Sequence, residues 1–83
     1  EENLKRTVDD INNIKKLVNI NNPKTYIYCI PKEIKLYEEN KEFLKNVTNS
    51  KLIEVFAVND KGKYDPKNKA NKAKIGKPAI FLE

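Results

Sequence analysis

The sequence contains no histidine, one cysteine and only two glycines. Without histidine, the chain lacks the commonest general base, the Ser-His and Cys-His pairs and histidine-containing zinc sites. Cys29 alone can form neither an internal disulfide nor a cysteine zinc knuckle, and it indicates a reducing compartment. Gly62 and Gly76 stand too far apart for a glycine-rich phosphate loop. We therefore predict no catalytic and no metal-binding residue, and we interpret Cys29 as a small buried hydrophobe.

Long apolar runs and an initiating methionine are also missing. The longest uncharged apolar run, TYIYCIP, is far too short to span a bilayer. No signal-peptide pattern is present, so we expect a cytoplasmic protein without a membrane partner. Eighty-three residues make one small domain, residues 1–83. The absence of a starting methionine suggests a piece of a longer protein.

Acidic residues are absent from positions 66 to 82, and this absence makes the charge distribution uneven. Residues 61–77, KGKYDPKNKANKAKIGK, carry seven lysines against the single acid Asp65, a local charge of +6. Residues 1–60 carry ten basic and ten acidic side chains and are neutral. We call residues 61–77 the lysine block. A positive segment beside a neutral body suits a polyanion, because phosphate contacts release counterions.

Two interpretations of the lysine block stay open. The chain has sixteen lysines and one arginine, so lysine abundance alone carries little information. The block can be a solvated loop, or it can bind nucleic acid, with lysines on phosphates and an aromatic ring stacked on a base. For the second interpretation we expect the following contact residues: Lys63, Tyr64, Lys67, Lys69, Lys72, Lys74 and Lys77.

Hydrophobic periodicity predicts two helices. In the first, apolar residues recur every three or four positions from Val8 to Val18, with Leu4 one turn earlier. Thr7 is a candidate N-cap and Asn21-Asn22-Pro23 is the stop. The second spans roughly residues 32–47 after Pro31. Its expected apolar stripe is Leu36, Phe43, Leu44 and Val47, with Asn40 as a flaw.

Three segments are typical of strands. Residues 24–30, KTYIYCI, are rich in β-branched and aromatic residues between two prolines. Residues 51–58 and 79–82 follow, and a short helix over residues 67–74 is compatible with the alanines there. The expected fold is α/β (α+β), with a small sheet of about three strands, two covering helices and a basic loop before the last strand. We expect one face of the first strand to pack on helices and the tyrosine face to be half open.

The end of the chain resembles a known family. Residues 63–83 resemble the C-terminus of archaeal and eukaryotic-type leucyl-tRNA synthetases. The matching residues are Asp65, Pro66, Lys69 and Ala70, followed by PAIFLE at residues 78–83. The stretches TVDDINNIKKL, KTYIYCIP and ENKEFL look like elements of the same appended domain. The join PKEIKLYEEN is shorter than the helical insertion found there in the family, so any RNA contact of that insertion cannot be carried over.

This resemblance implies a non-catalytic domain that contacts tRNA-Leu, chiefly its long variable arm. Its other partner would be the rest of a parent leucine–tRNA ligase, which would use ATP and magnesium, whereas this domain would hold no cofactor. Two alternatives belong to other classes. One is a protein-interaction module that uses an exposed face of Tyr26, Tyr28 and Phe56, and the other is a small enzyme domain, which the missing histidine disfavours.

Overall fold

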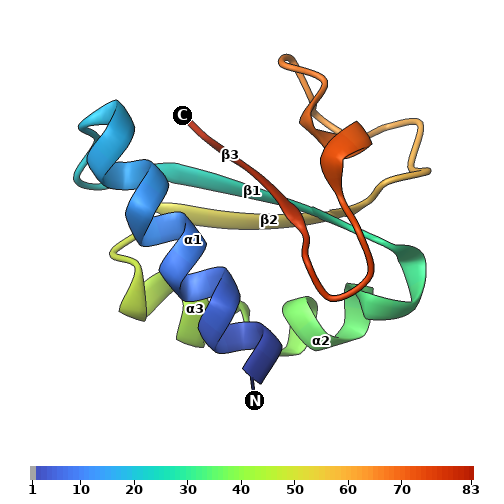
Figure 1. Ribbon diagram of the computed structural model, residues 1–83, viewed down its shortest axis with the longest axis horizontal. Helices are drawn as coiled ribbons and strands as arrows, with labels where there is room; N and C mark the ends of the chain where they lie inside the picture. Colours follow the sequence, from blue (N-terminus) through green and yellow to red (C-terminus); the bar gives the residue numbers. More distant parts are fainter. Residues whose placement is uncertain (1) are drawn as a thin grey trace.

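Three strands form one mixed sheet in the computed structural model, which describes residues 2–83 (Figure 1). The strands are β1 (Lys24–Cys29), β2 (Leu52–Ala57) and β3 (Ala79–Leu82), and their order is β2-β1-β3. β1 pairs in parallel with β2 from Lys24↔Leu52 onward, and antiparallel with β3 from Thr25↔Leu82 onward. The three predicted strands are therefore confirmed, and the expected α+β class agrees with the structure.

Helix α1 (Glu2–Val18) begins earlier than its apolar pattern suggested. Thr7 lies inside the helix, where its Oγ1 donates to the Asn3 carbonyl at 2.9 Å. The prediction of Thr7 as an N-cap is therefore wrong, because its hydroxyl satisfies a backbone carbonyl of the preceding turn. The helix ends with Asn19 in the left-handed region (φ 58°) and with Ile20 N–H donating to the Lys15 carbonyl at 3.2 Å, a Schellman closure.

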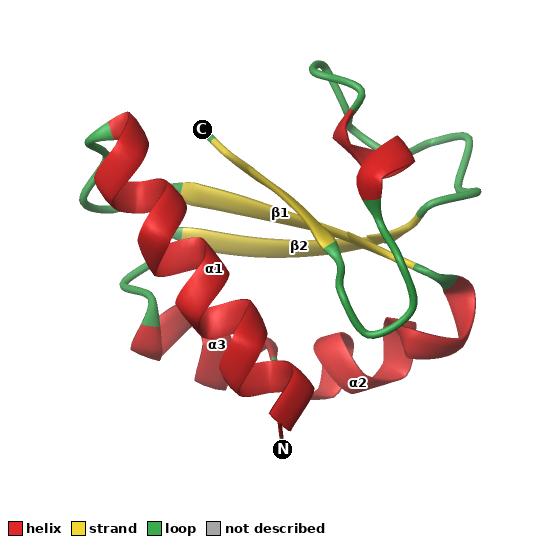
Figure 2. Cartoon of the chain, viewed as in Figure 1, coloured by secondary structure: helices red, strands yellow, loops and turns green. Residues whose placement is uncertain are grey.

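The predicted single helix over residues 32–47 is three pieces. A 3₁₀ turn, η1 (Pro31–Glu33), leads into α2 (Ile34–Glu39), and α3 (Lys41–Val47) follows after a break at Asn40. The Asn40 side-chain amide donates to the Leu36 carbonyl at 2.7 Å. Asn40 therefore separates α2 from α3, which carry separate labels in Figure 2.

The break at Asn40 changes which side chains face the core. Tyr37 and Leu44 are fully buried, whereas Phe43 and Val47 are 50% and 44% exposed. The expected stripe is therefore wrong at Phe43 and Val47, and it missed Tyr37. A continuous helical period cannot be projected across a break in the helix.

Each face of the sheet carries its own apolar cluster. On one face, Ile27, Ile53 and Ile80 pack with residues of α1, α2 and α3. On the other, Tyr26 and Tyr28 pack with Ala70 and Ala79. The helices thus cover one face, as expected, and the segment between β2 and β3 covers the other. No helix within residues 2–83 is both long and apolar enough to cross a bilayer.

Candidate nucleic-acid interface

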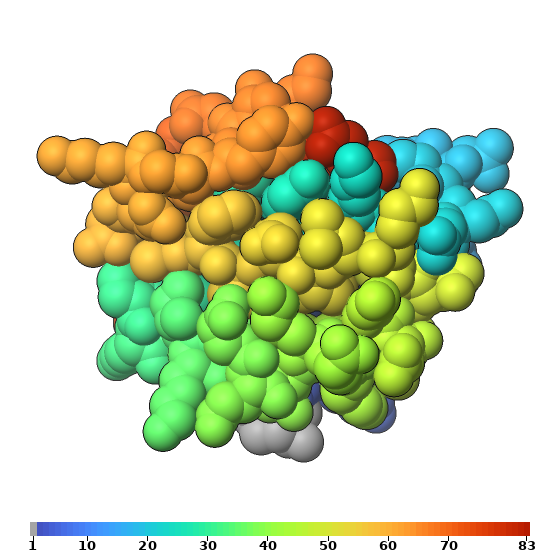
Figure 3. Space-filling model, turned by 180° about the vertical axis from the view of Figure 1, so that it is seen from behind, coloured from blue at the N-terminus to red at the C-terminus, as the bar shows by residue number. Residues whose placement is uncertain are grey.

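The lysine block folds over the tyrosine face of the sheet. Its 3₁₀ turn η2 (Lys69–Lys72) places Ala70 against the sheet, where it is 5% exposed. Tyr26 is 8% exposed and Tyr28 is fully buried, so the expectation that this face is half open is wrong. In the view from behind, residues 59 to 75 form a ridge along one side of the molecule (Figure 3). The block is therefore a packed segment with an inner and an outer side.

Asp65 organises the start of η2. Its Oδ1 accepts from Lys69 N–H at 2.7 Å and its Oδ2 accepts from Ala70 N–H at 3.0 Å, while its carbonyl accepts from Asn68 N–H. Asn68 itself adopts the left-handed conformation (φ 56°) that asparagine tolerates. The one acid of the block is thus bonded to backbone amides and makes no ion pair with a lysine among residues 2–83.

Three tyrosines and Glu83 attach the block to the sheet. The Tyr28 hydroxyl donates to the Tyr64 carbonyl, and the Tyr64 ring packs on Tyr26 with centroids 5.0 Å apart. Glu83 accepts from the Tyr64 hydroxyl at 2.6 Å and from the Tyr26 hydroxyl at 3.3 Å. These contacts fix Tyr64 at the edge of the cluster, with 44% of its surface exposed.

The pKa of each tyrosine hydroxyl in this cluster is raised above the ordinary value of 10.0. Burial, followed by the charge of Asp65, raises the pKa of Tyr28. Burial and the neighbouring Glu83 carboxylate raise the pKa of Tyr26. The hydrogen bond to Glu83 raises the pKa of Tyr64. The three hydroxyls are therefore hydrogen-bond donors at neutral pH, those of Tyr26 and Tyr64 to the Glu83 carboxylate and that of Tyr28 to the Tyr64 carbonyl.

A tight turn ends the block. Lys74 and Lys77 exchange both backbone hydrogen bonds, at 2.8 and 3.0 Å, around Ile75 and Gly76. Gly76 has φ +72°, a conformation that side chains disfavour, and its N–H donates to Glu33 Oε2 at 2.8 Å. Glu33 of η1 therefore holds the turn through the backbone of Gly76. Lys74 and Lys77 stand at paired backbone positions of this turn.

Four of the predicted lysines line one groove. It has a volume of about 440 Å³, and it is lined in part by Pro78 and by the first two residues of β3, Ala79 and Ile80. The lysines that line it are Lys69, Lys72, Lys74 and Lys77. We call it the lysine groove. η2 supplies the first two lysines and the Lys74–Lys77 turn supplies the others, so the groove depends on both anchors described above.

The remaining predicted contact residues lie outside this groove. Lys63 bonds to the Asp60 carbonyl at 3.2 Å. Lys67 lines a neighbouring groove together with Lys69. Tyr64 belongs to the tyrosine cluster. The structure therefore brings together four of the seven residues and places the other three along the same segment.

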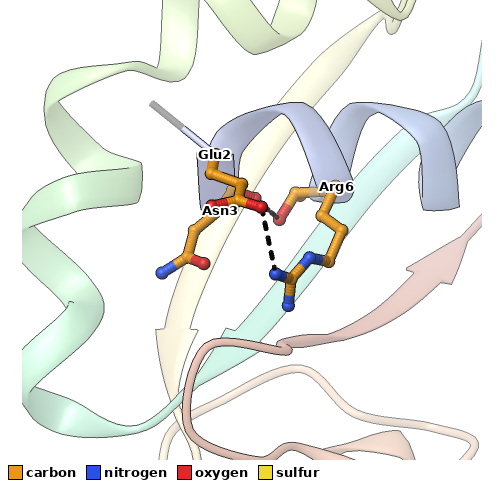
Figure 4. Close-up of polar contacts among 4 residues, drawn as sticks. Glu2, Asn3 and Arg6 are labelled. Atoms are coloured by element: carbon orange, nitrogen blue, oxygen red, sulfur yellow. Dashed lines mark hydrogen bonds and ion pairs between the residues drawn. The ribbon is translucent and has the colours of Figure 1, made fainter.

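The lysines of the groove have no anionic partner within residues 2–83. The ion pairs in this part of the chain join Arg6 to Glu2 at 3.7 Å, within α1 (Figure 4), and Lys41 to Glu38 at 3.9 Å. Neither pair includes a lysine of the block. Four positively charged side chains line one hollow, so an anion bound there would be attracted by all four.

Sequence reasoning missed three supports of the site: the Asp65 cap, the Glu33 contact and the Glu83 acceptor. In the sequence, Asp65 stood out as the single acid of the lysine block and as part of the resemblance of residues 63–83. Asp65 accepts from amides four and five residues along the chain, which is outside the spacing of an ordinary N-cap. Glu33 and Glu83 act across the fold and leave no local pattern.

Cys29 lies far from any such chemistry. It is a free thiol, fully buried on the helix-covered face, and burial raises its pKa to about 11. A thiol that stays protonated at neutral pH is a poor nucleophile. Among residues 2–83, no group of three or more His, Cys, Asp or Glu side chains is arranged to hold a metal ion.

Comparisons with family models, with curated proteins and with solved structures find no match to this chain.

Proposed function

We propose that this domain binds structured RNA through the lysine groove and that it performs no chemistry itself. The observation that carries this proposal is the lysine groove: four lysine side chains line one hollow and make no ion pair within residues 2–83. Lysines bind phosphates as point charges, and such contacts give affinity without base specificity. Lys63 and Lys67 extend the positive surface on the same segment.

The resemblance of residues 63–83 to leucyl-tRNA synthetases supports a particular RNA. We propose that the ligand is tRNA-Leu, that its long variable arm meets the lysine groove, and that the domain acts in the cytoplasm as part of a parent ligase. The parent would supply ATP and magnesium. The residues that carry the resemblance, Asp65, Ala70 and the PAIFLE strand, are those that shape and anchor the groove.

Tyr64 has a specific place in this proposal. Its ring is partly exposed at the edge of the cluster, so a base stacked on it would extend the existing Tyr26–Tyr64 contact. Tyr26 and Tyr28 are buried beneath the block. A protein partner that used Tyr26, Tyr28 and Phe56 would therefore have to displace the lysine block first.

The test is binding of labelled tRNA-Leu to charge-matched variants. Replacing the four groove lysines by glutamine should weaken binding roughly tenfold or more at low salt, because several phosphate contacts are lost together. The control replaces four exposed lysines elsewhere, Lys16, Lys32, Lys35 and Lys45, and changes net charge equally. Equal losses in both variants would show that net charge acts without the groove.

A second arm addresses the RNA. A tRNA with a short variable arm should bind the unaltered domain more weakly than tRNA-Leu. If both tRNAs bind equally well and the groove variant still loses affinity, RNA binding stands and the variable-arm assignment fails.

A further inference from the structure

A second groove adjoins the lysine groove and has a different lining. It lies between the last turns of α1 and the strand β3 and has a volume of about 570 Å³. Figure 1 shows the C-terminal half of α1 beside the end of β3. The groove is lined by Ile14, Leu17, Val18, Ile80, Phe81, Leu82, Lys67 and Lys69. We call it the apolar groove.

Two of its apolar residues are open to water. Leu17 is 84% exposed and Val18 is 47% exposed, although both stand in the last turn of α1. The Schellman closure of this helix uses backbone groups of Lys15, Asn19 and Ile20 and does not require a leucine at position 17. Single exposed apolar side chains are ordinary, but these two border a hollow whose other wall is also apolar.

We propose that the apolar groove binds an amphipathic protein segment whose apolar face enters the groove and whose flank is acidic. Pockets of about 300–1,000 Å³ hold a drug-sized molecule, so this one has room for roughly two large apolar side chains. Such anchors, spaced along one face of a helix, are how helices dock into grooves. The acidic flank follows from Lys67 and Lys69, which make no ion pair within residues 2–83.

The lining favours a protein segment over an RNA base. Phe81 is the only ring among the six apolar lining residues, and the other five are aliphatic. A base buried against aliphatic side chains would lose hydrogen bonds from its polar edges, whereas leucine or phenylalanine side chains lose none. An added β-strand is also disfavoured, because Ala79, Ile80 and Leu82 are each at most 8% exposed.

The two grooves share Lys69 and Ile80. A segment bound in the apolar groove would therefore occupy one of the four lysines of the lysine groove. The segment can be tested for binding in the absence of RNA, so the result does not depend on whether the domain binds RNA.

The probe is a helical peptide of about four turns with a leucine stripe and flanking glutamates, paired with a second peptide in which glutamines replace the glutamates. Binding is followed on the isotopically labelled domain by NMR, through the amide and methyl signals of Leu17, Val18 and Ile80. We expect these signals to shift and the acidic peptide to bind at least about fivefold tighter than the neutral one.

Variants locate the site. Leu17→Gln should weaken the acidic peptide about fivefold or more, since an apolar anchor contact is lost. Lys67→Gln should weaken only the acidic peptide. Phe43→Gln, at a half-exposed apolar residue of the hollow between α1 and α3, should change nothing.

Three results would overturn the proposal: no shifts at millimolar peptide, equal affinity for both peptides, or shifts centred on Phe43. A fourth would replace it with a base pocket: Leu17→Gln weakening RNA binding while neither peptide binds.

Discussion

Individual residues in the lysine block have roles that their charge alone does not describe. Asp65 is the one acid among seven lysines, and both of its carboxylate oxygens accept backbone N–H groups of η2. If only charge mattered, Asp65 would lower the positive potential of the block and so weaken the binding of an anion. Its contacts make it the residue that orders Lys69 and its neighbours.

Asp65→Ala separates these two views. Removing an acid raises the net charge by one, which alone would strengthen RNA binding. We expect weaker binding instead, by several-fold, together with a loss of about 1 kcal/mol of stability, since two amides lose their cap. Titration with tRNA and thermal melting measure both. Glu39→Ala, an exposed acid outside the block, is the control and should leave stability unchanged. Tighter binding by Asp65→Ala would show that charge outweighs geometry here.

Cys29 gives a residue-scale prediction about pH. Its pKa is about 11 in the folded protein, against an ordinary value of 9.0. The unfolded chain therefore loses the thiol proton first as pH rises, and the free energy of unfolding falls between about pH 9 and pH 11. Below pH 9 this contribution is fully present.

Denaturant unfolding of the wild type and of Cys29→Ala at several pH values isolates the effect, because the tyrosines titrate in both proteins. The wild type should lose stability more steeply above pH 9, and both should bind RNA equally. Parallel pH profiles would show that the thiol is not shielded as its burial implies.

At the scale of elements, the sequence predicted what repeats locally and missed what depends on contacts across the chain. Strands β1, β2 and β3 were foreseen because β-branched and aromatic runs are bounded by proline, asparagine and serine. The break at Asn40 was visible as a flaw in an apolar stripe, but its consequence for Phe43 and Val47 was not. Strand order could not be deduced, because the parallel β1–β2 pair and the antiparallel β1–β3 pair depend on which elements cover each face.

The candidate site divides in the same way. The contact lysines were predicted because residues 66–82 contain no acidic residue, and the charge of a segment can be read from its sequence alone. That Tyr26 and Tyr28 lie beneath the block was missed, because the alternation of a strand does not tell what covers its second face.

β3 and the lysine block should respond differently to change. Deleting residues 79–83 removes Ile80 and Leu82 from the core and Glu83 from the tyrosines, so we expect loss of both stability and RNA affinity. Reversing Lys69 and Lys72 to glutamate should lower affinity alone. Lys72 is exposed, and Lys69 takes part in the fold through its backbone N–H, which donates to Asp65 Oδ1.

Thermal melting and tRNA binding are measured on both variants. A drop in melting temperature for the double reversal as large as that for the truncation would make these lysines part of the fold. The assignment of the lysine groove would then fail.

The whole molecule combines a neutral body with one positive segment. The helices cover one face of the sheet and the block covers the other. Asp65 bonds amides within the block, while Glu33 and the tyrosine cluster with Glu83 attach the block to the rest of the domain. A ligand would thus meet lysines on a folded segment, whose backbone need not be ordered on binding.

The central claim is that several lysines of one groove bind phosphates, and the salt dependence of tRNA-Leu binding tests it most directly. Each phosphate contact contributes roughly −0.7 to −0.9 to the slope of log K against log salt concentration. Three or four contacts at the lysine groove predict a slope of about −2 to −3.5 for the unaltered domain. The variant with the four groove lysines replaced by glutamine should have a much shallower slope, because only Lys63 and Lys67 would remain to contact phosphates. A flat response of the unaltered domain, or the same steep slope in both proteins, would contradict the claim.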